Sequence, residues 1–74
     1  MLDLIDFAVE NHGSIYLVRP LTEAAQEHAD EVYAEAMTFG GAVAVEHRYA
    51  DHNISLLLSD GFRVSLDGDE VELS

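Results

Sequence analysis

The pattern of hydrophobic and polar positions first predicts two strands. In residues 6–10 the apolar Phe7 and Val9 alternate with small or charged neighbours, a period of two that is typical of a half-buried strand. An Asn-His-Gly turn at 11–13 follows, and residues 14–21 then form a nearly continuous apolar, β-branched run that suits a central strand. We therefore expect the two segments to pair as a hairpin.

A helix is predicted after Pro20, which is expected to end the second strand. Thr22 is a suitable N-cap, and the hydrophobic period changes to 3.6 over residues 23–38. Gly40 and Gly41 are expected to end this helix. The face predicted to be buried carries Ala25, Ala29, Val32, Tyr33 and Ala36.

The second half of the chain contains a further strand and a further helix. Residues 42–46, Ala-Val-Ala-Val-Glu, predict a second buried strand. Residues 48–59 predict a helix that ends at Gly61, because Ala50, Ile54, Leu57 and Leu58 recur at helical spacing. A strand through 54–58 stays open as an alternative, since the following Ser-Asp-Gly can also close a hairpin.

The last residues complete the predicted fold. Residues 62–66 predict a strand, and residues 70–73, after Asp-Gly-Asp, either pair back or fray. The expected order is β-β-α-β-α-β with a possible short last strand, in one α+β domain over 1–74 whose two helices pack on one face of a small sheet. A right-handed crossover between the strands at 14–19 and 42–46 would make that pair parallel.

Charge is the most unusual feature of the composition. The 74 residues include fifteen Asp and Glu against three Arg and no Lys, for a formal net charge of −12. Nucleic acid and anionic membranes would repel such a chain, so its expected partners are cationic: a basic protein surface or bound cations. With 49% hydrophobic residues the sequence is too apolar for a disordered acidic tail.

Composition also bounds the chemistry and the compartment. The chain has no cysteine, which excludes disulfides, zinc-thiolate sites and thiol nucleophiles. A small domain without disulfides is expected in the cytoplasm. The first ten residues lack the basic region of a signal peptide, and no apolar run reaches the length of a membrane span.

Polar side chains that could take part in catalysis or metal binding lie close together at 46–52, at the end of the second buried strand and directly after it. His47 and Asp51 are four residues apart and would share one helix face, whereas His52 would point elsewhere. The spacing is not the His-Glu-x-x-His pattern of helical zinc sites, so a metal-binding module around His47 and Asp51 is an alternative only. An ion pair for Arg48 with a carboxylate and a core-edge position for Tyr49 are the structural interpretation.

We expect neither an enzyme nor a cofactor-binding protein. No serine lies in a nucleophile-elbow pattern, and no glycine-rich loop has phosphate-binding spacing. Paired carboxylates are present, but fifteen acids in 74 residues produce such pairs by chance. A domain of this size also has little room for an enclosed active site.

The first predicted helix has a ladder of carboxylates on the face opposite its apolar residues. Like charges four residues apart destabilise a helix, yet no Lys interrupts this series. The rise of about 6 Å between successive carboxylates is of the same order as the spacing of phosphates along a nucleic-acid strand. The predicted partner-binding residues are Glu23, Glu27, Asp30, Glu31 and Glu35.

Two segments, HGSIYLVRPLTEAA (12–25) and FGGAVAVEHRYADHNISLLLSDGFRV (39–64), resemble a family of small uncharacterised proteins encoded by bacterial prophages and mobile elements. The shared features are a Gly-Ser-Ile strand, a Pro-Leu-Thr helix start and a Val-Glu-His-Arg-Tyr stretch that leads into a helix. The resemblance implies a helix over 48–59 and transfers no activity. This chain departs from the pattern at Glu-Ala-Met-Thr-Phe-Gly-Gly, where typical members have a Trp.

A phage context implies a function class, because phages encode short acidic proteins that imitate DNA, anti-CRISPR proteins among them. The leading hypothesis is therefore an acidic interaction protein, monomeric or homodimeric, in the host bacterial cytoplasm. It would block a basic nucleic-acid-binding surface of a CRISPR–Cas subunit or of another DNA-binding host protein. The alternative is a structural domain whose acidity only keeps it soluble, as at high salt.

Overall fold

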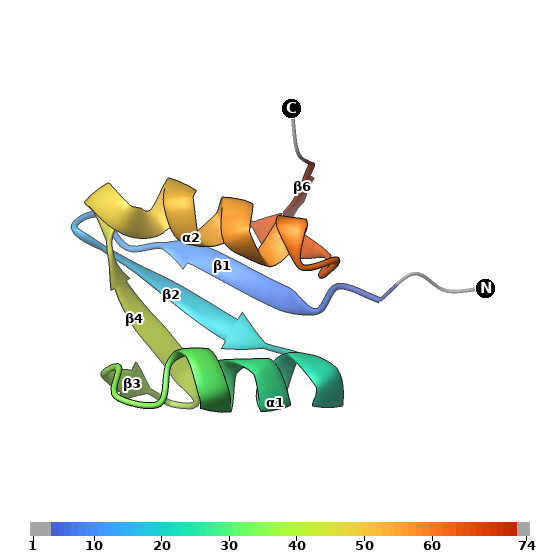
Figure 1. Cartoon of the computed structure of the whole chain (residues 1–74). Coiled ribbons are helices and arrows are strands. Elements are labelled where there is room, and N and C mark those ends of the chain that lie inside the picture. The colour runs from blue at the N-terminus through green and yellow to red at the C-terminus, as the bar shows by residue number, and fades with distance from the viewer. Residues whose placement is uncertain (1–3, 73–74) are drawn as a thin grey trace.

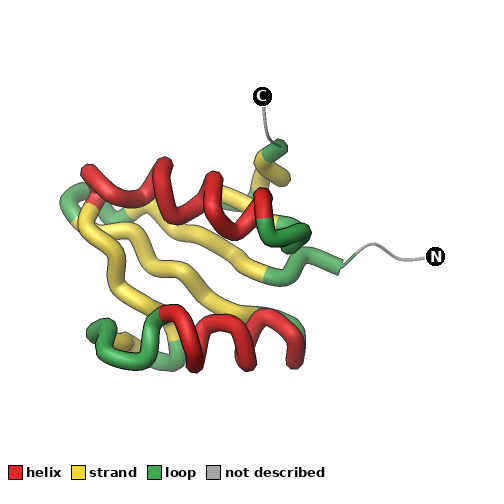
Figure 2. The backbone as a smooth tube through the Cα atoms, viewed as in Figure 1, coloured by secondary structure: helices red, strands yellow, loops and turns green. Residues whose placement is uncertain are grey.

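The computed structural model describes residues 4–72 and shows an α+β fold in two layers (Figures 1 and 2). Six strands form one sheet in the order β3-β4-β2-β1-β5-β6, and two helices lie on one of its faces. The predicted fold class and element order are confirmed, with additional short strands. The elements are β1 (Phe7–Asn11), β2 (Ile15–Pro20), α1 (Glu23–Val32), β3 (Thr38–Phe39), β4 (Ala42–Glu46), α2 (His47–Ser59), β5 (Val64–Leu66) and β6 (Asp69–Val71).

The first two strands form the predicted antiparallel hairpin, with Val9 opposite Val18. Its turn contains Gly13 at φ 85°, a conformation that glycine adopts without steric cost. The Gly13 N–H donates to Asn11 Oδ1 at 2.8 Å, an Asx-type contact that fixes the reversal. The second strand ends at Pro20 as expected and lies inside the sheet between β1 and β4.

The pairing of β2 with β4 is antiparallel, so the parallel pairing that we predicted is wrong. The reason is the two-residue strand β3, which the hydrophobic pattern does not reveal. Gly40 and Gly41 have φ of 55° and 83°, and positive values at both central residues make a tight hairpin turn between β3 and β4. The crossover from β2 through α1 therefore leads to β3, and the hairpin then reverses the chain into β4.

The first helix is shorter than predicted, because it ends at Val32 with Tyr33 as its C-cap. Residues 38–39 are extended and paired with β4, and the Ala44 N–H donates to Met37 O at 2.9 Å, so the chain must leave the helix before that point. Val32 is 55% exposed and does not belong to the buried face. The predicted N-cap is confirmed, since Thr22 Oγ1 accepts from the Ala25 N–H at 3.1 Å.

The second helix settles the choice between helix and strand for residues 54–58 in favour of helix. Its C-terminus is a Schellman motif, in which the Gly61 N–H donates to Leu58 O and the Phe62 N–H donates to Leu57 O, each at 3.1 Å. The φ of 91° at Gly61 supplies the left-handed residue that this motif requires. Ala50, Ile54 and Leu57 form its buried face.

The last strands extend the sheet beyond β1. The pairing of β1 with β5 is parallel, with Phe7 beside Val64. A turn at Asp67 and Gly68 then lets β6 pair antiparallel with β5, so the segment after that turn pairs back instead of fraying. Leu73, in the predicted segment 70–73, lies outside the described residues.

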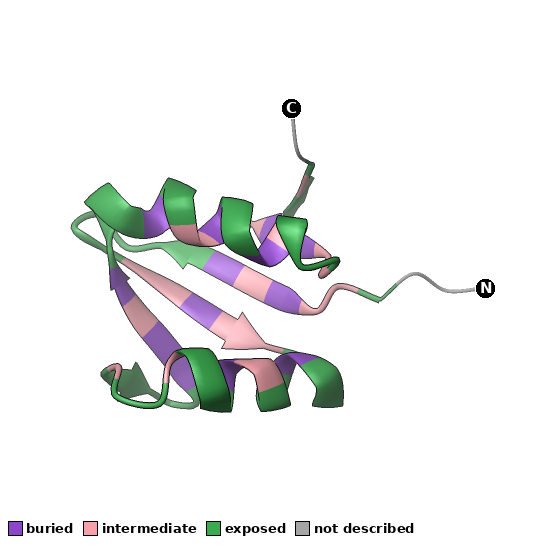
Figure 3. Cartoon of the chain, in the orientation of Figure 1, coloured by how far each residue is buried: buried purple, intermediate pink, exposed green. Residues whose placement is uncertain are grey.

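One hydrophobic core lies between the sheet and the helices (Figure 3). The helices run antiparallel, because His28 of α1 lies near the end of α2 and Tyr33 lies near its middle. The His28 ring is centred 4.7 Å from the Phe62 ring, and the Tyr33 hydroxyl donates to Asn53 Oδ1 at 3.0 Å. The residues that form this core cluster are Phe7, Val9, Val18, Ala25, Ala29, Val43, Val45, Ile54, Leu57 and Val64, and Ala42 and Ala50 are also buried.

A partly buried carboxylate joins three segments that are distant in the sequence. Asp6 Oδ1 accepts from Thr22 Oγ1 at 2.7 Å, and Asp6 Oδ2 accepts from the Arg63 N–H at 2.9 Å. Backbone bonds reinforce the junction, since the Asp6 N–H donates to Arg63 O and the Leu21 N–H donates to Asp6 O. The start of β1, the N-cap of α1 and the start of β5 are thereby held together.

We predict that Asp6→Ala lowers the free energy of unfolding by about 2 kcal/mol, because it leaves the Arg63 N–H and the Thr22 hydroxyl without their acceptor. Urea denaturation measures the change. Glu10→Ala, which removes an exposed acid near the far end of β1, is the control and should stay within about 0.5 kcal/mol of the original protein. A loss for Asp6→Ala that is no larger than for the control would contradict this role.

Candidate functional site

The acidic residues predicted to bind a partner are all exposed, but they do not all lie on the helix. Glu23, Glu27, Asp30 and Glu31 belong to α1. Glu35 lies in the turn after Tyr33. The predicted series of carboxylates four residues apart, Glu23, Glu27, Glu31 and Glu35, is therefore wrong at its last position. We call Glu23, Glu27, Asp30 and Glu31 the acidic face of α1.

The acidic face has no positive counter-charge within the described part of the chain. No ion pair shorter than 4.0 Å involves its carboxylates there. Asp30 Oδ1 accepts a hydrogen bond from Gln26 Nε2 at 2.9 Å, which fixes the position of one carboxylate without neutralising it. The negative potential of α1 is therefore directed into solvent.

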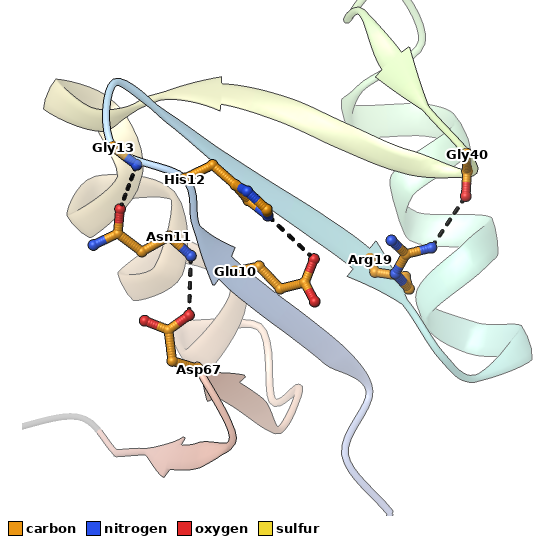
Figure 4. A network of polar contacts seen from close by, with 7 residues as sticks. All are labelled: Glu10, Asn11, His12, Gly13, Arg19, Gly40 and Asp67. Atoms are coloured by element: carbon orange, nitrogen blue, oxygen red, sulfur yellow. Dashed lines mark hydrogen bonds and ion pairs between the residues drawn. The ribbon is translucent and has the colours of Figure 1, made fainter.

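The side chains of the three arginines have partners outside that face. Arg48 Nε donates to Glu46 Oε2 at 2.9 Å. Arg19 Nη1, on β2, donates to Gly40 O, in the turn between β3 and β4, at 3.1 Å (Figure 4). Arg63 pairs with Glu70 through two hydrogen bonds. This bond lowers the pKa of Glu70 and raises that of Arg63, because each ion stabilises the charged form of the other.

The polar stretch after β4 contributes to the architecture. The predicted Arg48–carboxylate pair is confirmed, with Glu46 as the partner. Tyr49 is 52% exposed, and its ring lies 5.1 Å from the Arg48 guanidinium carbon, so it packs beneath a cation instead of covering the core edge.

His47 and Asp51 lie one turn apart at the start of α2, as the spacing predicts. A structural zinc site needs four ligands and a catalytic one needs three. Within residues 4–72 no group of three or more His, Asp or Glu side chains is placed to hold a metal ion. The geometry therefore offers two candidate ligands at this position and no support for a complete site.

A pocket of about 380 Å³ lies beside the acidic face, and sequence reasoning missed it. Ala29 and Val43 are buried at its floor, whereas Gln26, Asp30 and Thr38 are polar residues of its wall and Tyr33 adds an aromatic residue. It exists because α1 ends early and the turn that follows contains only short side chains, Ala34 and Ala36, on this wall. The Gly-Gly pair was the one signal in the sequence for the hairpin that closes it.

Comparison of the chain with protein-family models, with curated proteins and with solved structures finds no match. Within residues 4–72, neither α1 nor α2 is long and apolar enough to cross a membrane. The function must therefore be inferred from the charge distribution and from the pocket.

Tyr33 in the pocket wall gives a pH-dependent prediction. Burial raises its pKa above the usual 10.0, because the ionised phenolate loses solvation. The contribution of the neutral Tyr33 side chain to the free energy of unfolding is therefore fully present below pH 10.0, the unfolded-state pKa. It is lost as the pH rises through the raised folded-state pKa, because the unfolded chain ionises first. Urea denaturation of the original protein and of Tyr33→Phe should therefore give a constant difference in unfolding free energy below about pH 10. The difference should then shift against the original protein at higher pH, and one that stays constant there would contradict the effect.

Proposed function

We propose that this protein is an interaction protein whose acidic face on α1 occupies a basic nucleic-acid-binding surface of another protein. The observation that carries the proposal is the exposed series Glu23, Glu27 and Glu31 on one short helix, without counter-charge among residues 4–72. Basic surfaces that bind nucleic acid recognise regularly spaced anions, and electrostatic attraction accelerates such encounters.

The distribution of charge supports a binding role over a purely solubilising one. Each arginine side chain bonds within the fold, to Glu46, to Glu70 or to a backbone carbonyl, and none forms an ion pair with a carboxylate of α1 among residues 4–72. A surface that only has to stay soluble tolerates cations between its acids, and such i,i+4 pairs would stabilise the helix. The acidic face therefore keeps an unfavourable arrangement that a cationic partner would relieve.

The proposed partner belongs to the DNA-binding proteins of a bacterial host, with CRISPR–Cas subunits as the first class to test. This follows from the resemblance to prophage-encoded proteins together with the net charge of −12. The protein would act in the host cytoplasm as a monomer or homodimer, by occupancy and not by catalysis.

The test is displacement of a fluorescent DNA duplex from basic DNA-binding proteins, Cas effector complexes among them. In the variant Glu23→Gln, Glu27→Gln, Glu31→Gln we expect about tenfold weaker displacement, since exposed ion pairs contribute roughly 0.5 kcal/mol each. Glutamine keeps the helix propensity and removes repulsion within α1, so the variant should fold.

The matched control removes three negative charges from exposed positions outside α1: Asp51→Asn, Asp69→Asn, Glu72→Gln. If the acidic face is the contact, this control should displace DNA within about threefold of the original protein, because only the long-range field changes. Equal weakening by both triple variants would show that net charge alone acts, and the assignment to α1 would fail.

A further inference from the structure

The pocket beside α1 can hold a specific group, and the charge around it indicates which one. Its volume of about 380 Å³ lies at the low end for ligand sites and suits one long side chain better than a cofactor. Its floor is apolar, with Ala29, Val43 and Pro20, and can pack against a methylene chain. Asp30 in its wall adds a carboxylate whose Oδ2 has no hydrogen-bond partner among the described residues.

The position of Asp30 connects the pocket to the acidic face. On α1, Asp30 follows Ala29, which is part of the core, and precedes Glu31, which points into solvent with Glu27. It is the member of the acidic face that also lines the pocket. A partner seated on the acidic face would therefore have the pocket directly at its edge.

The polar groups of the pocket match a guanidinium. Gln26 donates its amide N–H to Asp30 and so keeps its own carbonyl oxygen as an acceptor, and Thr38 adds a hydroxyl. The Tyr33 ring lines the same wall, and its hydroxyl is already engaged by Asn53. A planar cation with several donors can use these acceptors and the aromatic wall together.

We propose that this pocket, with Asp30 as its anion, accepts one arginine side chain of the partner protein. The inference rests on the proposed function, because the acidic face brings the basic partner to this position. The aliphatic part of the arginine packs on the floor of the pocket, and its guanidinium lies against Asp30. Association through the acidic face then gains one anchored contact that fixes its register.

The test uses a blocked Lys-Gly-Arg-Gly-Lys peptide and a twin with citrulline in place of arginine, titrated into the isotope-labelled protein and followed by NMR. Citrulline keeps the shape and removes the charge. The arginine peptide should bind about fivefold more tightly than its twin, the upper range for an exposed ion pair. The amide signals of Ala34, Ala36 and Gly41 should shift.

Two single variants and a control assign that preference to the pocket. In Asp30→Asn the ratio between the two peptides should fall to about one, whereas Asp51→Asn, which removes the same charge from α2, should keep it. Ala34→Met fills the pocket from an exposed position and should weaken the arginine peptide about fivefold. The assignment would be overturned if Asp30→Asn kept the roughly fivefold preference for the arginine peptide over the citrulline peptide. It would also be overturned if Ala34→Met bound the arginine peptide as tightly as the original protein does.

These outcomes separate the pocket from the proposed function. If Ala34→Met binds the arginine peptide normally while the α1 triple glutamine variant fails to displace DNA, the pocket assignment falls and the proposed function stands. If the triple variant displaces DNA normally while the Asp30→Asn ratio collapses, the proposed function falls and the arginine site remains.

Discussion

The arrangement of this small domain depends on the hydrogen bonds that the Asp6 carboxylate accepts. Through Thr22 it holds the first turn of α1, and through the Arg63 N–H it holds the start of β5. Thr22 in turn caps the helix by accepting from the Ala25 N–H. A chain of 74 residues buries a thin core, so a polar junction that joins β1, α1 and β5 carries a large share of its specificity.

That junction matters for the proposed function because α1 has little stability of its own. The helix has ten residues, below the length at which isolated helices persist in water. Its carboxylates repel one another, and Glu31 lies in the last turn, where the helix dipole disfavours a negative charge. The Thr22 cap and the burial of Ala25 and Ala29 offset these costs and keep the acidic face in place. The fold thus holds an unfavourable set of charges in a defined position.

Most of the fold could be predicted from the sequence where one local signal dominated. The period of two in β1, the Thr22 cap and the Gly61 helix end each follow from a single physical preference, and each is confirmed. The resemblance and the periodicity agreed on a helix over 48–59, and α2 lies there. The charge pattern likewise identified acids on α1 that are exposed, although their role in binding is still a prediction.

The errors arose where two signals competed for the same residues. Gly40 and Gly41 suit a helix end as well as a tight hairpin, and only pairing of β3 with β4, a tertiary effect, decides between them. That choice shortened α1, placed Glu35 outside the helix and reversed the expected direction of β4. It also created the pocket, which no local pattern could reveal because Pro20, Asp30 and Val43 come from three different elements.

The most direct measurement is hydrogen–deuterium exchange of the backbone amides, free and in complex with a basic DNA-binding protein identified by the displacement experiment. Binding is expected to slow exchange over Glu23–Val32 and over residues 33–43, while exchange in β5, β6 and the C-terminal half of α2 changes little. Protection concentrated on those latter elements, with α1 unchanged, would contradict the claim that the acidic face of α1 is the contact surface.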